Sequence, residues 1–148
     1  LMKTLILYGS LTGNTQYVAE QISEFLTQSG IEHEIMNANS FSVKDVLNYD
    51  LLLLGSSTWD DGILQYDFDA FFQEVQDFDF TDKKIAVFGC GDSSYEHFCG
   101  AVDTIEKFWQ EKGAIKLINS LKIDGFPQQE PNLELLQKWL ADLQTNLK

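Results

Sequence analysis

The chain has 148 residues, of which 44% are hydrophobic and 22% charged, and ten Lys stand against 23 Asp and Glu for a net charge of −13. This composition is typical of a single globular domain spanning residues 1–148, and it excludes a disordered tail or a fibrous repeat. Because nucleic acid and anionic lipid repel so acidic a chain, we expect neither as a partner. Proteins that carry basic patches fit better.

Short apolar runs recur along the chain and predict the strands of a sheet. Those at residues 4–8, 51–55 and 85–89 are rich in Leu, Ile or Val, as expected for strands that are buried on both faces. The run at 115–118 is weaker. Residues 31–36 mix apolar with charged side chains, as an edge strand would.

Amphipathic patterns between these runs predict helices at residues 15–29, 69–76, 102–111 and 133–147. Ser42 caps a shorter predicted helix at 43–47. Regular alternation of strands and helices predicts an α/β fold, a three-layer sandwich with a parallel sheet of five strands, right-handed crossovers and helices on both faces.

The cysteines and histidines form no recognisable metal or disulfide pattern. Cys90 and Cys99 are not part of a Cys-x-x-Cys pair, and His33 and His97 are isolated from other ligand types. We therefore expect reduced thiols in a cytoplasmic protein. The apolar run at residues 5–8 is too short for a signal peptide or a membrane span.

Polar and small residues follow three of the predicted strands, at residues 9–15, 56–62 and 89–100. In an open parallel sheet, ligands bind beyond the carboxyl ends of the strands. The hydroxyls of the first loop and the free N–H groups of the following helix suit a phosphate, although an ordinary capped turn has the same pattern. This loop lacks the Gly-Lys-Ser/Thr ending of an NTPase P-loop and the Gly-x-Gly-x-x-Gly fingerprint of dinucleotide sites.

The second and third loops each offer a prominent aromatic side chain, Trp59 and Tyr95, and two such side chains can clamp a planar ring. Carboxylates crowd the same region, and no Lys lies among them. These acids are Asp60, Asp61, Asp67, Asp69, Asp92, Glu96 and Asp103.

Residues 12–15, 57–59 and 89–95 together resemble, in order and spacing, the FMN loops of the short-chain flavodoxins. The resemblance covers nearly all of the chain. It implies the strand order 2-1-3-4-5, a non-covalently bound FMN and a low-potential one-electron carrier rather than an enzyme. Such a carrier is expected to be a monomer that shuttles electrons between larger redox proteins.

The resemblance also implies which residues contact FMN. The phosphate is assigned to Ser10, Leu11, Thr12, Gly13, Asn14, Thr15 and Ser57. The ring is assigned to Thr58 and Trp59 on its inner face and to Tyr95 on its outer face. Cys90, Gly91, Asp92, Phe98 and Cys99 are expected to border the ribityl chain and the pyrimidine end of the ring.

Two positions depart from the family pattern. His97 stands where close relatives often carry a second aromatic residue, and Asp60 stands where the family usually has Gly beside flavin N5. A positive φ costs Asp about 1 kcal/mol, so we expect the turn formed by Trp59, Asp60, Asp61 and Gly62 to be type I, with a negative φ at Asp60.

Two other classes of protein share this strand order. A flavin-dependent reductase for NAD(P)H or a quinone needs a second substrate pocket, an extra segment or a dimer, for which 148 residues leave little room. A response-regulator receiver needs acidic residues after the first and third strands, where this chain has Gly-Ser-Leu-Thr and Gly-Ser-Ser-Thr.

Overall fold

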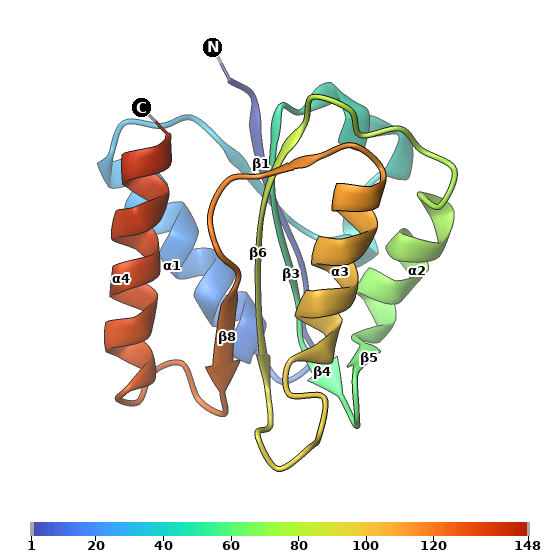
Figure 1. Cartoon of the computed structure of the whole chain (residues 1–148). Helices are drawn as coiled ribbons and strands as arrows, with labels where there is room; N and C mark the ends of the chain where they lie inside the picture. Colours follow the sequence, from blue (N-terminus) through green and yellow to red (C-terminus); the bar gives the residue numbers. More distant parts are fainter. Residues whose placement is uncertain (1, 148) are drawn as a thin grey trace.

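The computed structural model describes residues 2–147 and alternates strands with helices along the chain (Figure 1). The strands are β1 Thr4–Gly9, β2 Glu34–Asn37, β3 Leu51–Ser56, β4 Thr58–Trp59, β5 Ile63–Leu64, β6 Lys84–Gly91, β7 Ile115–Lys116 and β8 Leu121–Asp124. The α-helices are α1 Asn14–Gln28, α2 Tyr66–Glu74, α3 Gly100–Glu111 and α4 Asn132–Asn146. Two 3₁₀ helices, Ala38–Ser40 and Val43–Asn48, precede β3.

The main sheet is parallel and runs in the order β2-β1-β3-β6, with both β7 and β8 paired to β6. This arrangement confirms the strand order 2-1-3-4-5 that the resemblance implied. Strands β4 and β5 form a separate antiparallel hairpin.

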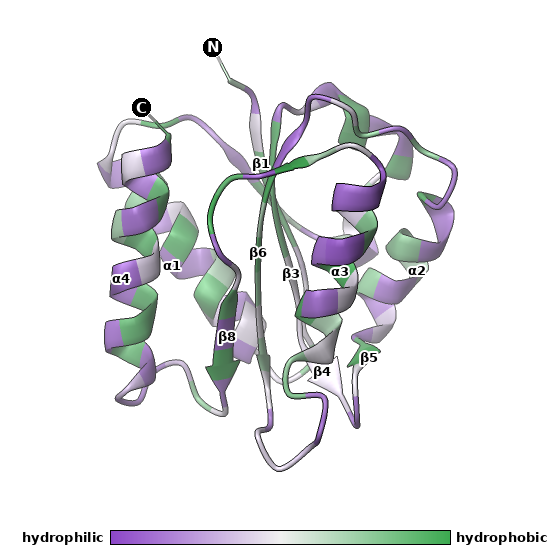
Figure 2. Cartoon of the chain, in the orientation of Figure 1, coloured by the Kyte–Doolittle hydropathy of each residue, from purple (hydrophilic) through white to green (hydrophobic). Residues whose placement is uncertain are grey.

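Two hydrophobic cores lie on opposite faces of the sheet. Leu5 and Leu7 of β1 point into the core beneath α2 and α3, whereas Ile6 and Tyr8 point into the core beneath α1 and α4. This alternation follows from the two-residue period of a strand. Figure 2 shows apolar residues along the strands and the inner sides of the helices, with hydrophilic residues outside.

The predicted fifth strand is confirmed only in part. Only Ile115–Lys116 of residues 115–118 pairs with β6, and the chain then leaves the sheet before β8 begins at Leu121. Strand β8 alternates buried Leu121 and Ile123 with the more exposed Lys122 and Asp124, so it lacks the continuous apolar run by which the other strands were found.

Other elements differ from their predicted bounds or type for local reasons. Helix α2 begins at Tyr66 rather than residue 69, because the Gln65 side chain accepts hydrogen bonds from the backbone N–H groups of Asp67 and Phe68. The short helix predicted at 43–47 is a 3₁₀ helix rather than an α-helix. The hairpin β4–β5 was not predicted, since each of its strands has two residues.

In residues 2–147, no helix combines the length and apolar character needed to cross a membrane. No three His, Cys, Asp or Glu side chains of this part of the chain lie together in a way that could hold a metal ion.

Candidate functional site

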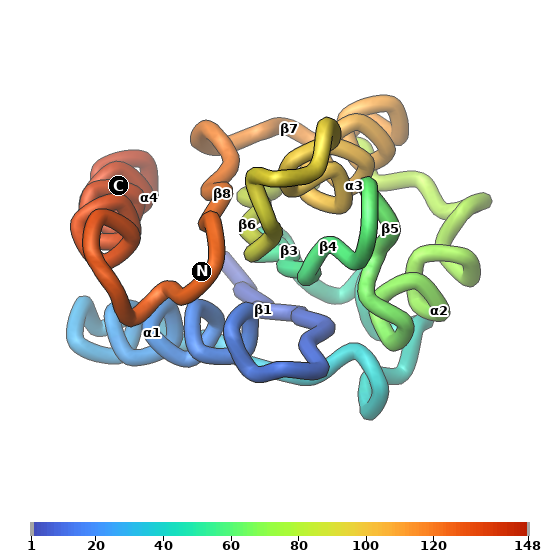
Figure 3. Tube along the Cα trace, turned by 90° about the horizontal axis from the view of Figure 1, so that it is seen from below, coloured from blue at the N-terminus to red at the C-terminus, as the bar shows by residue number. Residues whose placement is uncertain are grey.

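Three loops meet at one edge of the sheet, where β1, β3 and β6 end. The register places Gly9 of β1 beside Ser56 of β3, and Gly55 of β3 beside Phe88 of β6. Figure 3 views this edge directly, with the loop after β6 next to hairpin β4–β5. The structure therefore brings together the three segments that the sequence singled out, residues 9–15, 56–62 and 89–100.

The loop after β1 ends in a helix N-terminus that suits an anion. Gly13 is the N-cap of α1 at φ +94°, and no side chain caps the helix. The N–H groups of the first turn are therefore free to bind an anion. The first turns of α2, α3 and α4 each contain an acidic residue, but that of α1 has none.

Space is available at this helix end for a bound group. A Cβ atom built on Gly13 would meet no atom within 4 Å, and Leu11 and Thr12 are exposed. Ser10 stabilises the loop from within, because its hydroxyl accepts a 3.2 Å hydrogen bond from the N–H of Gly13. The loop fits a phosphate group with respect to charge, hydrogen-bond donors and space.

Two hydroxyls form the buried floor beneath this loop. The side chains of Thr15 and Ser57 are joined by a 2.7 Å hydrogen bond, and Thr15 is completely buried. The loops after β1 and β3 are further linked by a 3.3 Å bond from the N–H of Ser57 to the carbonyl of Gly9. Both hydroxyls are therefore paired with each other in this structure, beneath the open side of the loop.

Hairpin β4–β5 carries the half-buried Trp59, and its turn contradicts our expectation for Asp60. Asp60 has φ +46° and Gly62 has φ +101°, so the turn is not a type I turn. Pairing of Trp59 with Ile63 leaves three residues to reverse the chain, and this tight reversal outweighs the modest cost of a left-handed Asp.

The loop after β6, residues 92–99, presents Tyr95 with 41% of its surface exposed. Asp92 shapes the loop by accepting a 2.9 Å bond from the N–H of Ser94 and, through its carbonyl, a 3.2 Å bond from the N–H of Tyr95. Hydrogen bonds from Ser94 lower the pKa of Asp92, which keeps this carboxylate charged. Phe98 is half-buried against the core beneath α2 and α3.

Residues outside the predicted set also shape the site. Asp124 at the end of β8 accepts a 3.0 Å bond from the N–H of Ser93 and a second bond from its hydroxyl. The N–H of Gln65 donates to the hydroxyl of Ser56 at 3.0 Å, which anchors the hairpin to β3. No local sequence signal indicates Asp124, because it is separated from Ser93 by 31 residues.

The two cysteines are buried on opposite faces of the sheet. Cys90 belongs to the core under α1 and α4, and Cys99 to the core under α2 and α3, where its thiol lies 3.8 Å from the Gly89 carbonyl. Burial raises the pKa of Cys90 to about 11 and that of Cys99 to about 12. Both thiols are therefore protonated at neutral pH, and the Cys99 side chain is completely buried.

His97 and Asp61 connect the loop after β6 to the turn of the hairpin. The Asp61 carboxylate accepts a 2.7 Å bond from the backbone N–H of His97 and lies 3.0 Å from its ring Nδ1. Hydrogen bonding to Asp61 raises the pKa of His97, and the bonds from His97 lower the pKa of Asp61.

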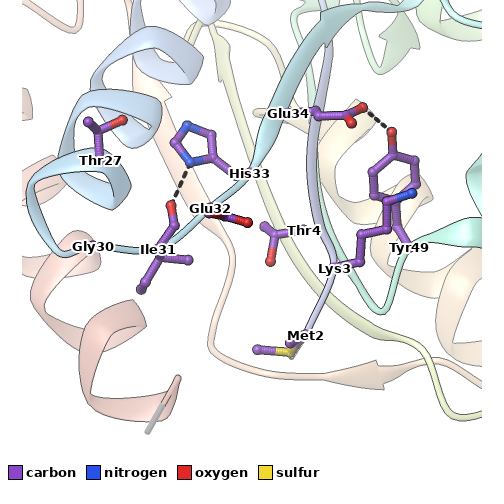
Figure 4. A pocket seen from close by; sticks show the side chains of 10 residues that line it. All are labelled: Met2, Lys3, Thr4, Thr27, Gly30, Ile31, Glu32, His33, Glu34 and Tyr49. Carbon is purple, nitrogen blue, oxygen red and sulfur yellow. Dashed lines mark hydrogen bonds between the residues drawn. The ribbon is translucent and has the colours of Figure 1, made fainter.

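A separate cavity of about 820 Å³ lies at the amino end of β1 and β2, away from the three loops (Figure 4). Two pairs of its lining residues are joined by hydrogen bonds, whereas the buried hydroxyl of Thr4 has no hydrogen-bond partner among residues 2–147. His33 Nδ1 donates to the carbonyl of Ile31 at 2.9 Å, and the Tyr49 hydroxyl donates to Glu34, as the dashed lines of Figure 4 show. None of the predicted site residues lines this cavity.

Comparisons with known proteins agree with the geometry. Residues 6–139 match the flavodoxin family. The chain is 44% identical over 133 residues to a flavodoxin of Maridesulfovibrio salexigens, covering 88% of this chain and 91% of that one. It is 43% identical to a flavodoxin of Nitratidesulfovibrio vulgaris over 86% of this chain and 88% of the relative.

Solved structures show the same fold. Oxidised flavodoxin 2 from Bacillus cereus superposes with a TM-score of 0.90 and 34% identity, covering 97% of this chain and 98% of that one. A Fusobacterium nucleatum flavodoxin bound to flavin mononucleotide has a TM-score of 0.80 at 18% identity, over 98% of each chain. The chain therefore belongs to the flavodoxin family, which makes FMN its cofactor and electron transfer, rather than enzymatic turnover, its role.

Proposed function

We propose that residues 1–148 form one FMN-binding domain that carries single electrons at low potential between larger redox proteins. The observation that carries this proposal is the meeting of an acid-free helix N-terminus with two aromatic-bearing loops at one edge of the sheet. The first feature suits the phosphate of FMN and the other two suit its planar ring.

The phosphate is assigned to the first loop and to the buried hydroxyls beneath it. The N–H groups at the start of α1 donate to the phosphate, with the exposed Thr12 hydroxyl and the Asn14 side chain beside them. Thr15 and Ser57 form the floor, and either hydroxyl can turn toward the phosphate in place of its neighbour. Ser10, Leu11 and Gly13 complete the loop.

The ring is assigned to the space between the second and third loops. Thr58, Trp59 and the turn at Asp60, Asp61 and Gly62 bound it on one side, and Tyr95 covers the other. Gly91, Asp92, Phe98 and the backbone at Cys90 and Cys99 border the remaining edge, and His97 belongs to the same loop as Tyr95. FMN supplies the one-electron chemistry when bound, and these residues hold the ring and exclude water from its faces.

The end of the molecule at the three loops suits a basic protein partner. The three loops and the start of α2 expose four large apolar side chains, those of Leu11, Ile63, Tyr66 and Tyr95, with 41–73% of their surfaces accessible. The same parts of the chain carry Asp60, Asp61, Asp67, Asp92 and Glu96, and none of the chain's ten lysines lies in residues 57–65 or 91–99. Such a surface steers partners with basic patches toward the cofactor.

We also propose a monomer in the cytoplasm. Cys90 and Cys99 are unpaired and lie on opposite sheet faces, which fits a compartment that keeps thiols reduced. The acidic residues around the three loops disfavour association of two copies through this end of the molecule, because like charges would face each other.

Stepwise reduction of the FMN-loaded protein tests the function. We expect reduction in two separate one-electron stages in the visible spectrum, and no consumption of NADH or NADPH by the protein alone. Reduction in one two-electron stage, or unaided NAD(P)H turnover, would assign the chain to the flavin-dependent reductases instead.

A further inference from the structure

Carboxylates hold loop 92–99 at both of its flanks. On the side of β8, Asp124 accepts both the backbone N–H and the hydroxyl of Ser93. On the side of the hairpin, Asp61 accepts the backbone N–H of His97 at 2.7 Å and contacts its ring nitrogen at 3.0 Å. The two clamps have the same design, in which one carboxylate binds a backbone N–H and the side chain of the same residue.

The two clamps differ in one property, since His97 titrates near neutral pH and Ser93 does not. The His97–Asp61 contact is an ion pair when the imidazole is protonated and a neutral hydrogen bond when it is not. The side chains of His97 and Asp61 are 66% and 45% exposed, so proton exchange with solvent is unhindered.

The remaining contacts between the hairpin and this part of the chain are independent of pH. The N–H of Ala101 donates to the Thr58 hydroxyl at 3.1 Å. Gly100 packs so closely that a Cβ there would lie 2.8 Å from the Cα of Gly62. Among these contacts, only the His97–Asp61 pair changes its strength with the proton concentration.

Few charged groups other than Asp61 act on His97. Glu96 of its own loop is acidic and raises the pKa of His97 further, and Asp60 is the other acidic residue of the turn. Helix α3 begins with uncharged residues, and its first acid, Asp103, pairs with Lys122 at 2.8 Å. No lysine competes with His97 for Asp61 in the hairpin or in loop 92–99.

We propose that Asp61 and His97 are positioning residues whose ion pair sets how hairpin β4–β5 and loop 92–99 close on FMN, so that FMN affinity depends on the ionisation of His97. This inference rests on the proposed function, because Asp61 and His97 belong to the same turn and loop as Asp60 and Tyr95, the residues assigned to the two sides of the ring. The pair itself need not touch FMN.

The sign of the effect follows from linkage. A group whose pKa is raised by its partner gives stabilisation that is complete below the unperturbed pKa and is lost as the pH rises through the raised value. Hydrogen bonding to Asp61 raises the pKa of His97. The pair therefore holds the two segments together best below about pH 6.5 and less well at alkaline pH.

The test combines FMN titrations with the ¹H NMR signals of the imidazole rings. The chain has two histidines, and His33, paired with Ser23 and Ile31 at a distance from the three loops, serves as an internal reference. We expect FMN binding to raise the pKa of His97 by about 0.3–0.7 units and to leave the NMR signals of His33 unchanged. Reciprocity then requires FMN affinity to fall about twofold to fivefold between pH 6 and pH 9.

Three variants separate the titrating pair from other effects of pH, including ionisation of the FMN phosphate. In His97→Gln and Asp61→Asn, we expect the part of the fall in FMN affinity between pH 6 and pH 9 that comes from the His97–Asp61 pair to disappear. The part that comes from ionisation of the FMN phosphate should remain. In the matched control Asp124→Asn, which weakens the clamp without a titrating partner, FMN binds less tightly but the pH dependence of the wild type remains. A pKa of His97 that is the same with and without FMN would overturn the proposal.

The wild-type NMR titration requires no variant, so a failure of any variant to fold does not remove the test. Failure of the proposed function is distinguishable from failure of this inference. If the protein bound no FMN, the function assignment would be wrong, whereas FMN binding without a change at His97 would disprove only the positioning role.

Discussion

At the scale of single residues, Asp60 is the position where the conformation differs most from expectation. Its φ of +46° lies in the left-handed region, which L-residues other than Asn and Asp avoid. Gly62, two residues later, is also left-handed at φ +101°. The chain therefore reverses with an Asp at a position where glycine would carry no strain.

We predict opposite outcomes for two substitutions at this residue. Asp60→Ala should lower the free energy of unfolding of the FMN-free protein by about 0.5–1 kcal/mol, because Ala gains no local hydrogen bond that compensates a positive φ. Asp60→Gly should leave it within about 0.5 kcal/mol of the wild type, since the relief of strain is offset by the greater freedom of the unfolded chain. Urea denaturation at neutral pH measures both values.

Gln137 on the exposed side of α4 provides the control. At position 137 the order of stability of the Ala and Gly variants should reverse. Ala should be more stable than Gly by about 1 kcal/mol, because Ala has the higher helix propensity. If Ala exceeded Gly in stability at position 60 as well, the left-handed conformation of Asp60 would be wrong. In the FMN-loaded protein, Asp60→Gly should shift the first one-electron potential by no more than about 60 mV.

At the scale of elements, the N-terminus of α1 is the feature most directly tied to the cofactor. It lacks a side-chain cap and an acidic residue in its first turn, in a chain with a net charge of −13. An ordinary helix would gain stability from either, typically about 0.3–1 kcal/mol for an acid near the N-terminus. The helix gives up this stabilisation and keeps its N–H groups available for the phosphate.

Gln16, in the first turn of α1, tests this trade between stability and binding. We predict that Gln16→Glu stabilises the FMN-free protein by about 0.3–1 kcal/mol through the helix dipole. The same change should weaken FMN binding about tenfold, because the new carboxylate repels the phosphate at short range. Fluorescence titration with FMN and thermal unfolding of the FMN-free protein measure the two effects.

Riboflavin and a second variant complete this experiment. Riboflavin has no phosphate, so its affinity should be the same for Gln16→Glu and the wild type. Gln28→Glu places the same charge at the other end of α1 and should leave FMN affinity unchanged. Equal losses for FMN and riboflavin would show that this helix end does not bind the phosphate.

At the scale of the whole molecule, lysines do not balance the acids of the proposed site. Residues 57–67 and 91–99 contain Asp60, Asp61, Asp67, Asp92 and Glu96 and no lysine, whereas acids such as Asp50 and Asp82 accompany Lys3, Lys83 and Lys84 at or before the amino ends of the strands. The negative field of these segments steers a basic partner toward the proposed site, and salt screens it beyond about 10 Å at 0.1 M.

Replacing Asp67, Asp92 and Glu96 by their amides tests the role of this charge. We predict that the second one-electron potential of bound FMN rises by tens of millivolts, on the order of 20 mV per carboxylate at about 10 Å, because reduction adds negative charge beside these groups. The rise should shrink at high salt. Potentiometric titration at two ionic strengths measures both effects.

The matched control neutralises three exposed acids away from the three loops, Glu32, Asp77 and Glu111. It removes the same net charge and should change the potential by much less, because these groups lie far from the cofactor. Equal shifts in the two triple variants would mean that net charge, rather than its placement around FMN, sets the potential.

The sequence by itself determined the class of fold and the edge of the sheet where the three loop motifs meet. Buried strands such as 51–55 have to be apolar on both faces, and amphipathic helices such as 15–29 have to show a 3.6-residue period, so both are legible without the structure. Strands β1, β3 and β6 and the helices α1 and α4 agree with these expectations to within one or two residues. The three loop motifs then indicated the family.

The tertiary structure decided features that depend on residues distant in the chain. The position of β8 follows from its pairing with β6, because its own alternating pattern is too short to predict a strand. The φ of Asp60 follows from closure of hairpin β4–β5. Asp61 meets His97 across 36 residues, and Ser93 meets Asp124 across 31, since the sheet brings the ends of separate strands to one edge. Local propensity contains no information on such contacts, and these contacts hold loop 92–99 in its observed conformation.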